Sequence, residues 1–316
     1  MKIFYGLSKV KKYRRPVVAL GVFDGLHRAH KEILEYVAKL SRRIKGQSLV
    51  VTFWPHPQKQ ESLYSLEHRL RLIARIGIDV CIVMRFNRIF SQIEPSDFVK
   101  NILVKKIGAD YICVGRNFRF GKNAKGDFRT LNRLSSIYNF KLKVFDVIKN
   151  NYQPISSTYI RRLINRGKLK SAQQLLGHPV SVLGTVIKGV SLAKRLGFPT
   201  ANINPHHEVL PPSGVYKVKV IFDHKKLNGI CYIGKKPTFP AQKSKSIEAH
   251  IFNFNKNIYG KYLEIQFLDK LRNEKKFSSL VALGRQVKKD IARTQKMFPH
   301  PFLALPKNSS YRSNNP

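Results

Sequence analysis

The sequence predicts two domains of different class: an α/β domain with a mostly parallel sheet, and then a small antiparallel β domain with a C-terminal helix. Three observations predict this division. The 316 residues give room for about two domains. In the first half, apolar strand-like runs alternate with helix-like segments. In the second half, strand-like runs follow one another with few helices between them.

Short apolar runs in the first half are the predicted strands, and the segments between them are the predicted helices. The strand-like runs are 17–22, 48–53, 80–85, 111–114 and 141–147. The helix-like segments lie near 30–44, 67–76, 95–107 and 127–138. This alternation predicts a parallel sheet covered on both faces, in which ligands bind beyond the carboxyl ends of the strands. The loops that follow the strands are therefore the candidate site.

The first of these loops, residues 21–30, reads Gly-Val-Phe-Asp-Gly-Leu-His-Arg-Ala-His and leads into a helical pattern. Glycines let the backbone approach a ligand closely, and the free N–H groups of a helix's first turn favour phosphate. His27 and His30 are three residues apart, so at a helix start they share one face and can both point at that phosphate. The stretch predicts a nucleotide site.

Two further loops carry side chains that suit a ligand. Residues 115–122 hold two glycines, two phenylalanines and three cations, which can stack a flat ring and neutralise phosphate. The phenylalanines can equally cap the domain's own core. In residues 54–57, His56 either contacts a ligand or belongs to a turn that two prolines stiffen.

A second phosphate-competent helix start follows the last predicted strand. Ser156, Ser157 and Thr158 precede an apolar-periodic run, and Arg161 follows one turn later. As structure, the string is a well-capped helix. As chemistry, it offers hydroxyls, N–H groups and a cation to a polyphosphate.

The strand-like runs of the second half are 181–187, 214–222, 229–234, 246–254 and 261–268, and an amphipathic segment over 278–297 follows them. They predict a small antiparallel barrel or sandwich. Thr200 and Asn202 offer two oxygens on one side of an extended strand, which suits Mg²⁺ beside nucleotide phosphates or simply a polar turn. Glu248 lies on the polar face of its strand, as a general base or as a surface acid.

The net charge is the unusual feature of the composition: 59 Lys and Arg against 18 Asp and Glu give a formal +41. A chain this basic attracts polyanions, so a nucleic-acid-binding protein on an enzyme fold is an alternative. Because the charge runs through both halves without a long uninterrupted block, we expect scattered solvated side chains and no specific nucleic-acid partner.

The remaining bulk features predict a cytoplasmic protein. The three cysteines are far apart and form no Cys-x-x-Cys motif, which is typical of reduced thiols in a reducing compartment. The N-terminus has no signal-peptide core, and no apolar run is long enough to span a bilayer, so no membrane partner is expected.

The motifs of the first half resemble, in order, those of the bacterial bifunctional riboflavin kinase/FAD synthetases. Residues 21–30 are similar to that family's G-x-F-D-G-x-H-x-G-H string, a variant of the H-x-G-H signature of nucleotidylyltransferases. Residues 52–57, 115–121 and 155–161 resemble its other adenylyltransferase motifs. The resemblance implies a Rossmann-like nucleotidylyltransferase domain that joins FMN to ATP, giving FAD and pyrophosphate. The family's glycine between the histidines is Ala29 here, which leaves open a narrower alternative, a riboflavin kinase with impaired adenylylation.

The second half resembles the kinase domain of the same family. Residues 197–203 are similar to the flavokinase G-F-P-T-A-N signature. Further resembling motifs are 212–216, 233–238, 258–260 and 271–277. The resemblance implies a small antiparallel β-barrel in which Thr200 and Asn202 coordinate Mg²⁺ with ATP, while Glu248 activates the ribityl hydroxyl of riboflavin to give FMN. The family's asparagine before Ile233 is Tyr232 here, and its aspartate near Asn253 is absent.

The resemblance also implies the other site residues and the domain limits. His27 and His30 would stabilise charge on the α-phosphate and its leaving group. The implied ATP-binding residues are Gly21, Phe23, Asp24, Gly25, Ser156, Ser157, Thr158, Arg161, Gly197 and Pro199. The implied flavin-binding residues are Asn117, Phe118, Phe120, Arg272 and Glu274. The expected divisions are an adenylyltransferase domain over 1–165, a connector over 166–180, a kinase domain over 181–298 and a disordered tail over 299–316.

Overall fold

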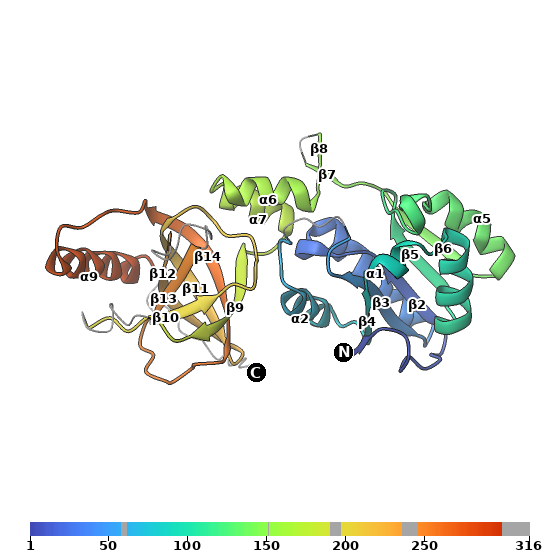
Figure 1. Ribbon diagram of the computed structural model, residues 1–316, viewed down its shortest axis with the longest axis horizontal. Helices are drawn as coiled ribbons and strands as arrows, with labels where there is room; N and C mark the ends of the chain where they lie inside the picture. The colour runs from blue at the N-terminus through green and yellow to red at the C-terminus, as the bar shows by residue number, and fades with distance from the viewer. Residues whose placement is uncertain (58–61, 151, 190–196, 236–244, 299–316) are drawn as a thin grey trace, which may run out of the picture.

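A computed structural model gives the structure of the chain and describes residues 1–57, 62–150, 152–189, 197–235 and 245–298. Within these residues, a parallel sheet with its helices and a closed antiparallel barrel lie side by side (Figure 1). The predicted disordered tail over 299–316 and part of the motif over 233–238 lie outside the described residues.

The parallel sheet has the order β1-β4-β3-β2-β5-β6. Its strands are β1 (Lys2–Tyr5), β2 (Pro16–Leu20), β3 (Gln47–Trp54), β4 (Val80–Arg85), β5 (Tyr111–Gly115) and β6 (Lys141–Phe145). From β2 the chain proceeds to β3 and β4 on one side and later to β5 and β6 on the other. Strand order therefore reverses between β2 and β5, and ligands of open parallel sheets bind at such a point, beyond the carboxyl ends of the strands.

Helices cover both faces of this sheet, as the alternating pattern predicts. They are α1 (Arg28–Arg43), α2 (Leu66–Ile76), α3 (Arg88–Ser91), α4 (Pro95–Asp97), the π-helix η2 (Phe98–Ile107) and α5 (Phe128–Tyr138). Alternate residues of β2 enter different apolar clusters: Val18 and Leu20 pack with η2, and Val17 and Ala19 pack with α1. The edge strand β1 was not predicted, because its apolar run is only three residues long; in the structure three of its four residues are exposed.

The second sheet is a closed barrel in the order β10-β13-β12-β11-β14-β9. Its strands are β9 (Ser181–Ile187), β10 (Ala201–Asn204), β11 (Gly214–Phe222), β12 (Lys225–Lys235), β13 (Lys245–Ile251) and β14 (Tyr262–Arg272). The four-residue β10 pairs with both β9 and β13, and this pairing closes the barrel rather than leaving a sandwich. Helix α9 (Leu280–Lys296) packs outside the barrel, at the end far from the parallel sheet (Figure 1).

Between the sheet and the barrel run the hairpin β7 (Lys149–Asn150) and β8 (Gln153–Pro154) and the helices α6 (Ser157–Asn165) and α7 (Leu169–Leu176). Both helices contribute to the apolar cluster that fills the barrel. The domain limits at 165 and 181 stay predictions.

A buried carboxylate joins the two halves. Glu208, beside the barrel, accepts hydrogen bonds from the backbone N–H groups of Ser65 at 2.8 Å and Leu183 at 3.0 Å. Nδ1 of His68, on α2, lies 3.0 Å from Oε2 of Glu208, and both side chains are almost wholly buried. Because carboxylate oxygens only accept, Nδ1 is the donor. The first half is thus fixed to the barrel by hydrogen bonds that water does not reach.

Candidate functional sites

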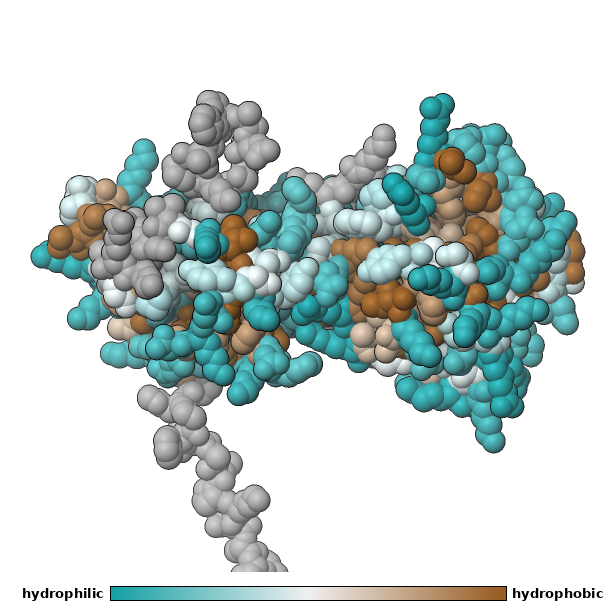
Figure 2. All heavy atoms as spheres, turned by 60° about the horizontal axis from the view of Figure 1, so that its bottom comes forward, coloured by the Kyte–Doolittle hydropathy of each residue, from teal (hydrophilic) through white to brown (hydrophobic). Residues whose placement is uncertain are grey.

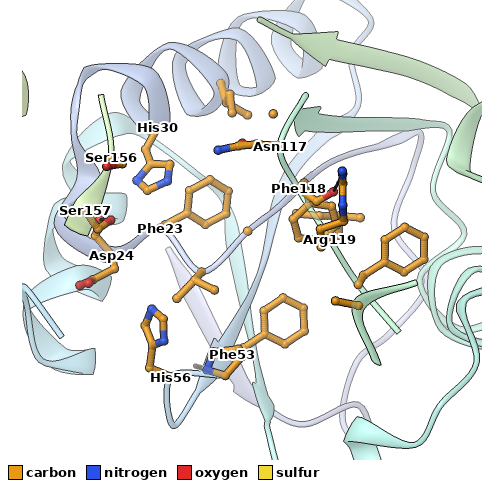
Figure 3. Close-up of a pocket in the computed structure, with 18 of the residues that line it drawn as sticks. Phe23, Asp24, His30, Phe53, His56, Asn117, Phe118, Arg119, Ser156 and Ser157 are labelled. Atoms are coloured by element: carbon orange, nitrogen blue, oxygen red, sulfur yellow. Dashed lines mark hydrogen bonds between the residues drawn. The ribbon is translucent and has the colours of Figure 1, made fainter. Parts of the chain in front are cut away.

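The first candidate site is a cavity of about 750 Å³ at the point where strand order reverses. Its walls come from the loops after β2, β3 and β5 and from the start of α6. That volume is typical of pockets that hold a nucleotide-sized ligand. Figure 2 shows apolar surface on the half that carries this sheet, with hydrophilic side chains around it. Figure 3 shows His30, Ser156 and Ser157 along one wall, with Phe118 and Arg119 across the cavity.

The two histidines lie together, as their spacing predicts. His27 is the residue at which α1 begins, and its ring stacks on that of His30 with centroids 3.7 Å apart. Neither Nδ1 atom has a hydrogen-bond partner among the described residues. Burial lowers the pKa of His27 to about 4, and burial next to His27 and Arg69 lowers the pKa of His30. Both rings are therefore neutral near pH 7, and each can present an N–H group from one nitrogen.

The glycines of this loop serve the packing of the chain itself. Gly25 has φ +79°, and a Cβ there would come within 2.5 Å of the Leu63 side chain. A Cβ on Gly21 would lie 2.9 Å from the ring of Phe23, which is buried under the loop. Gly21 also lines the cavity, so the predicted close approach of this backbone to a ligand stays a prediction.

Asp24 joins the loop to α6. Its carboxylate accepts hydrogen bonds from the backbone N–H groups of Leu63 and Tyr64, and Nη2 of Arg161 lies 3.3 Å away. Ser157 donates its hydroxyl to the carbonyl oxygen of Asp24 at 2.9 Å. Asp24 thus holds the α6 start against the loop, and the two phosphate-competent helix starts meet in one cavity.

The Ser156 hydroxyl caps α6 by accepting the N–H of Tyr159 at 3.2 Å, as its sequence pattern predicts. Its neighbour Thr158 also lines the cavity, as does His56, whose pKa burial lowers.

The two phenylalanines after β5 have different environments. Their rings are nearly parallel with centroids 5.7 Å apart. Phe120 is buried in the core against Phe98, whereas Phe118 is partly exposed and only borders that core. Both line the cavity, together with Asn117. The alternatives that the sequence left open, core packing and ring stacking, are therefore compatible here.

Sequence reasoning missed Arg69. Its side chain is 1% exposed and donates hydrogen bonds to the carbonyl oxygens of Val22 and Phe53, at the ends of β2 and β3. The guanidinium also lies over the ring of Trp54. An arginine between the apolar positions of an amphipathic helix was the available signal, because such a cation is buried only with partners. Arg69 fixes the two loops that form this end of the cavity.

The second candidate site lies on the outer face of the barrel. Asn202 on β10 and Glu248 on β13 are register partners, and the Thr200 hydroxyl donates to Oε2 of Glu248 at 3.4 Å. Burial raises the pKa of Glu248, which the Thr200 hydrogen bond opposes. Gly197 and Pro199 precede this strand, and the Pro199 carbonyl oxygen lies 2.8 Å from Nδ1 of His250.

The oxygens gathered here fit a magnesium ion that is shared with a nucleotide. A Cβ on Gly189 would lie 2.1 Å from the Asn202 amide, so only glycine leaves room for that side chain. Mg²⁺ takes few protein oxygens and completes its shell with phosphate and water, so Thr200 and Asn202 are the residues that could hold it here. Within the described residues, no three His, Cys, Asp or Glu side chains cluster in a way that could hold a metal ion without such help.

The predicted flavin-binding residues of the second half lie at the end of β14. Arg272 donates from Nε to Asp290 of α9 at 2.8 Å, and its guanidinium lies over Phe277. Glu274 is exposed and accepts a short hydrogen bond from the Tyr232 hydroxyl. The structure thus brings Glu248, Thr200 and Asn202 together. Glu274 is linked to the barrel by its hydrogen bond with the Tyr232 hydroxyl.

A cavity between two helix starts and a second polar site on a barrel are typical of a nucleotide-dependent transferase. Comparison with known proteins gives the family of the chain. Residues 9–159 match the family model for FAD synthetase, and residues 176–298 match that for riboflavin kinase. The chain belongs to the bifunctional riboflavin kinase/FMN adenylyltransferases, as its motifs predict.

The similarity extends over almost the whole chain. A protein of Buchnera aphidicola from Schizaphis graminum, named bifunctional riboflavin kinase/FMN adenylyltransferase, is 35% identical over 94% of this chain and 99% of its own length. The Escherichia coli K12 protein of that name is 31% identical, over 94% and 98%. A Streptococcus pneumoniae crystal structure titled macrolide-efflux protein has 27% identity and a TM-score of 0.79, covering 93% of this chain and 99% of that one. Among the residues that the structure describes, no helix is both long and apolar enough to cross a membrane.

Proposed function

We propose that the chain makes FMN from riboflavin and ATP at the barrel, and FAD from FMN and ATP in the cavity, with the residues named above in specific roles. The observation that carries this proposal is the separation of two complementary sites. One groups a carboxylate with two neutral oxygens, and the other groups two neutral histidines with a cation and two helix starts.

At the barrel, Glu248 would take the proton of the terminal ribityl hydroxyl while that oxygen attacks the γ-phosphorus of ATP, and ADP leaves. Its raised pKa makes it a stronger base than an exposed carboxylate. Thr200 and Asn202 would hold Mg²⁺, which supplies neutralisation of phosphate charge when bound. Gly197 and Pro199 would contact the nucleotide, and Arg272 and Glu274 the flavin.

In the cavity, a phosphate oxygen of FMN would attack the α-phosphorus of ATP, and pyrophosphate would leave. Neutral His27 and His30 would donate hydrogen bonds to the oxygens on which charge develops. Ser156, Ser157, Thr158 and Arg161 would hold the outer phosphates, while Gly21, Phe23, Asp24 and Gly25 shape the wall. Asn117, Phe118 and Phe120 would contact the flavin. Transfer of this kind depends mainly on positioning and charge stabilisation.

The test is a product assay with riboflavin, ATP and Mg²⁺, in which FMN and FAD are separated by chromatography. Wild-type chain should form both. Glu248→Ala should abolish FMN formation from riboflavin yet still convert supplied FMN to FAD. His30→Ala should accumulate FMN without FAD. Wild-type chain that forms no FMN would refute the kinase assignment, and FMN without FAD would refute the synthetase assignment.

We also propose that the enzyme works in the cytoplasm. Its three cysteines are free and buried, and burial raises the pKa of each thiol. Thiols of this kind are typical of proteins of a reducing compartment.

A further inference from the structure

A continuous row of residues crosses five strands on the outer face of the barrel. Asn202 pairs with Glu248, Glu248 with Tyr232, Tyr232 with Val215, and Val215 with Arg272. Register partners on one face of an antiparallel sheet have Cβ atoms about 5 Å apart. Tyr232 therefore lies directly beside the proposed base and between the metal-binding and flavin-binding ends of the row.

The side chain of Tyr232 extends along its own strand. A Cβ on Gly234 would come within 2.1 Å of the Tyr232 hydroxyl oxygen, so only glycine leaves room for the phenol ring to lie across that position. The ring belongs to the outer apolar cluster that also contains Phe198, from the proposed nucleotide-binding motif. On this side, apolar packing therefore links the Tyr232 ring to the proposed nucleotide-binding motif.

On its other side, the Tyr232 hydroxyl reaches the flavin-binding segment. It donates a hydrogen bond to Oε1 of Glu274, in a stretch without regular secondary structure between β14 and α9. Glu274 itself is exposed, so this bond fixes a carboxylate that would otherwise sample several rotamers. Hydrogen bonds to a charged acceptor are stronger than neutral ones.

We propose that Tyr232 is a positioning residue for riboflavin: its ring supports the acceptor beside Glu248, and its hydroxyl holds Glu274 at the flavin. This inference rests on the proposed kinase function of the barrel. It predicts that Tyr232 determines how tightly riboflavin binds, because it contacts the flavin side of the site and leaves the base, Thr200 and Asn202 in place. Phosphoryl transfer itself does not pass through Tyr232.

The test compares Tyr232→Phe, which keeps the ring and removes the hydroxyl, with Tyr152→Phe, an exposed tyrosine in the turn between β7 and β8 that belongs to neither candidate site. Tyr232→Phe should raise the KM for riboflavin about fivefold. Its kcat, its KM for ATP and its conversion of supplied FMN to FAD should stay within about twofold of wild type, since a single hydrogen bond at the flavin affects none of these steps. Tyr152→Phe should leave all of these quantities unchanged.

A second pair of variants examines the bond from the other partner. Glu274→Gln keeps an acceptor oxygen and should raise the KM for riboflavin less than Glu274→Ala does. Adding Tyr232→Phe to Glu274→Ala should have no further effect, because the bond is already lost. Wild-type turnover with an unchanged riboflavin KM in Tyr232→Phe would overturn the inference alone. Wild-type chain that forms no FMN and does not quench riboflavin fluorescence would overturn the proposed function and this inference together.

Discussion

The two proposed phosphate-transfer sites differ in their surroundings, since one is an enclosed cavity and the other lies on an outer face of the barrel. The cavity of the parallel sheet encloses its histidines, and burial keeps their pKa values low, so in the proposed reaction they would act as neutral donors. The barrel site lies on an outer face, where a half-buried carboxylate has its pKa raised and would act as a base. Burial disfavours charge in both places, and it produces a donor in one and a base in the other because the groups have opposite charge types.

The largest effect is expected at the buried junction around Glu208, which connects the two halves of the molecule. Glu208→Ala should lower the free energy of unfolding by about 4 kcal/mol, because it removes a buried acceptor from three donors. Thermal melts would measure this loss. Glu67→Ala, which removes the partner of the exposed Arg71 on the same helix α2, is the control and should cost less. Equal losses in the two variants would show that the buried junction is not special.

Acidification should separate the two activities. The kinase should lose activity first as the pH falls, because Glu248 must be ionised and its pKa is raised, whereas His27 stays neutral until about pH 4. The unfolded chain binds a proton at His27 below about pH 6.5 and the folded chain does not, so stability should fall over that range by about 3 kcal/mol for His27. Separate pH profiles for FMN and FAD formation check the order. A synthetase that fails at the higher pH would contradict it.

Arg69 tests whether the enclosed cavity depends on one buried cation. Arg69→Met should remove one donor from the carbonyl oxygen of Val22, which keeps the Thr52 hydroxyl, and the Arg69 donor from that of Phe53. This costs about 2 kcal/mol, and FAD formation should fall about 30-fold if the full amount is lost in the transition state. Kinase activity at the barrel should be unchanged. Arg71→Met, at an exposed position of the same helix, is the matched control. Loss of both activities in Arg69→Met would indicate general unfolding instead.

The smallest effect is expected from a substitution at Ala29. It lies in the first turn of α1 without a positive φ, so its methyl group causes no backbone strain. Ala29→Gly should therefore destabilise the protein by about 1 kcal/mol or less and leave the rate of FAD formation within about twofold. A large gain in FAD formation would show instead that the methyl group, which lines the cavity, obstructs the nucleotide.

The sequence alone determined the local parts. Alternating strands and helices predicted the covered parallel sheet, and the three-residue spacing of His27 and His30 predicted their shared face. The capped start of α6 was also readable, because a hydroxyl before an apolar run is a local signal. These predictions succeeded because the interactions involved span a few residues, and the ordered motifs then gave the family.

Only the tertiary structure determined which residues far apart in the sequence contact one another. Closure of the barrel depends on β10, a strand too short to stand out in the sequence, finding partners on both sides. The glycines of residues 21–30 admit protein side chains, and Arg69 and Tyr232 obtain their roles from carbonyl and carboxylate groups far along the chain. Such contacts follow from strand order and register, which a pattern of residue types does not contain.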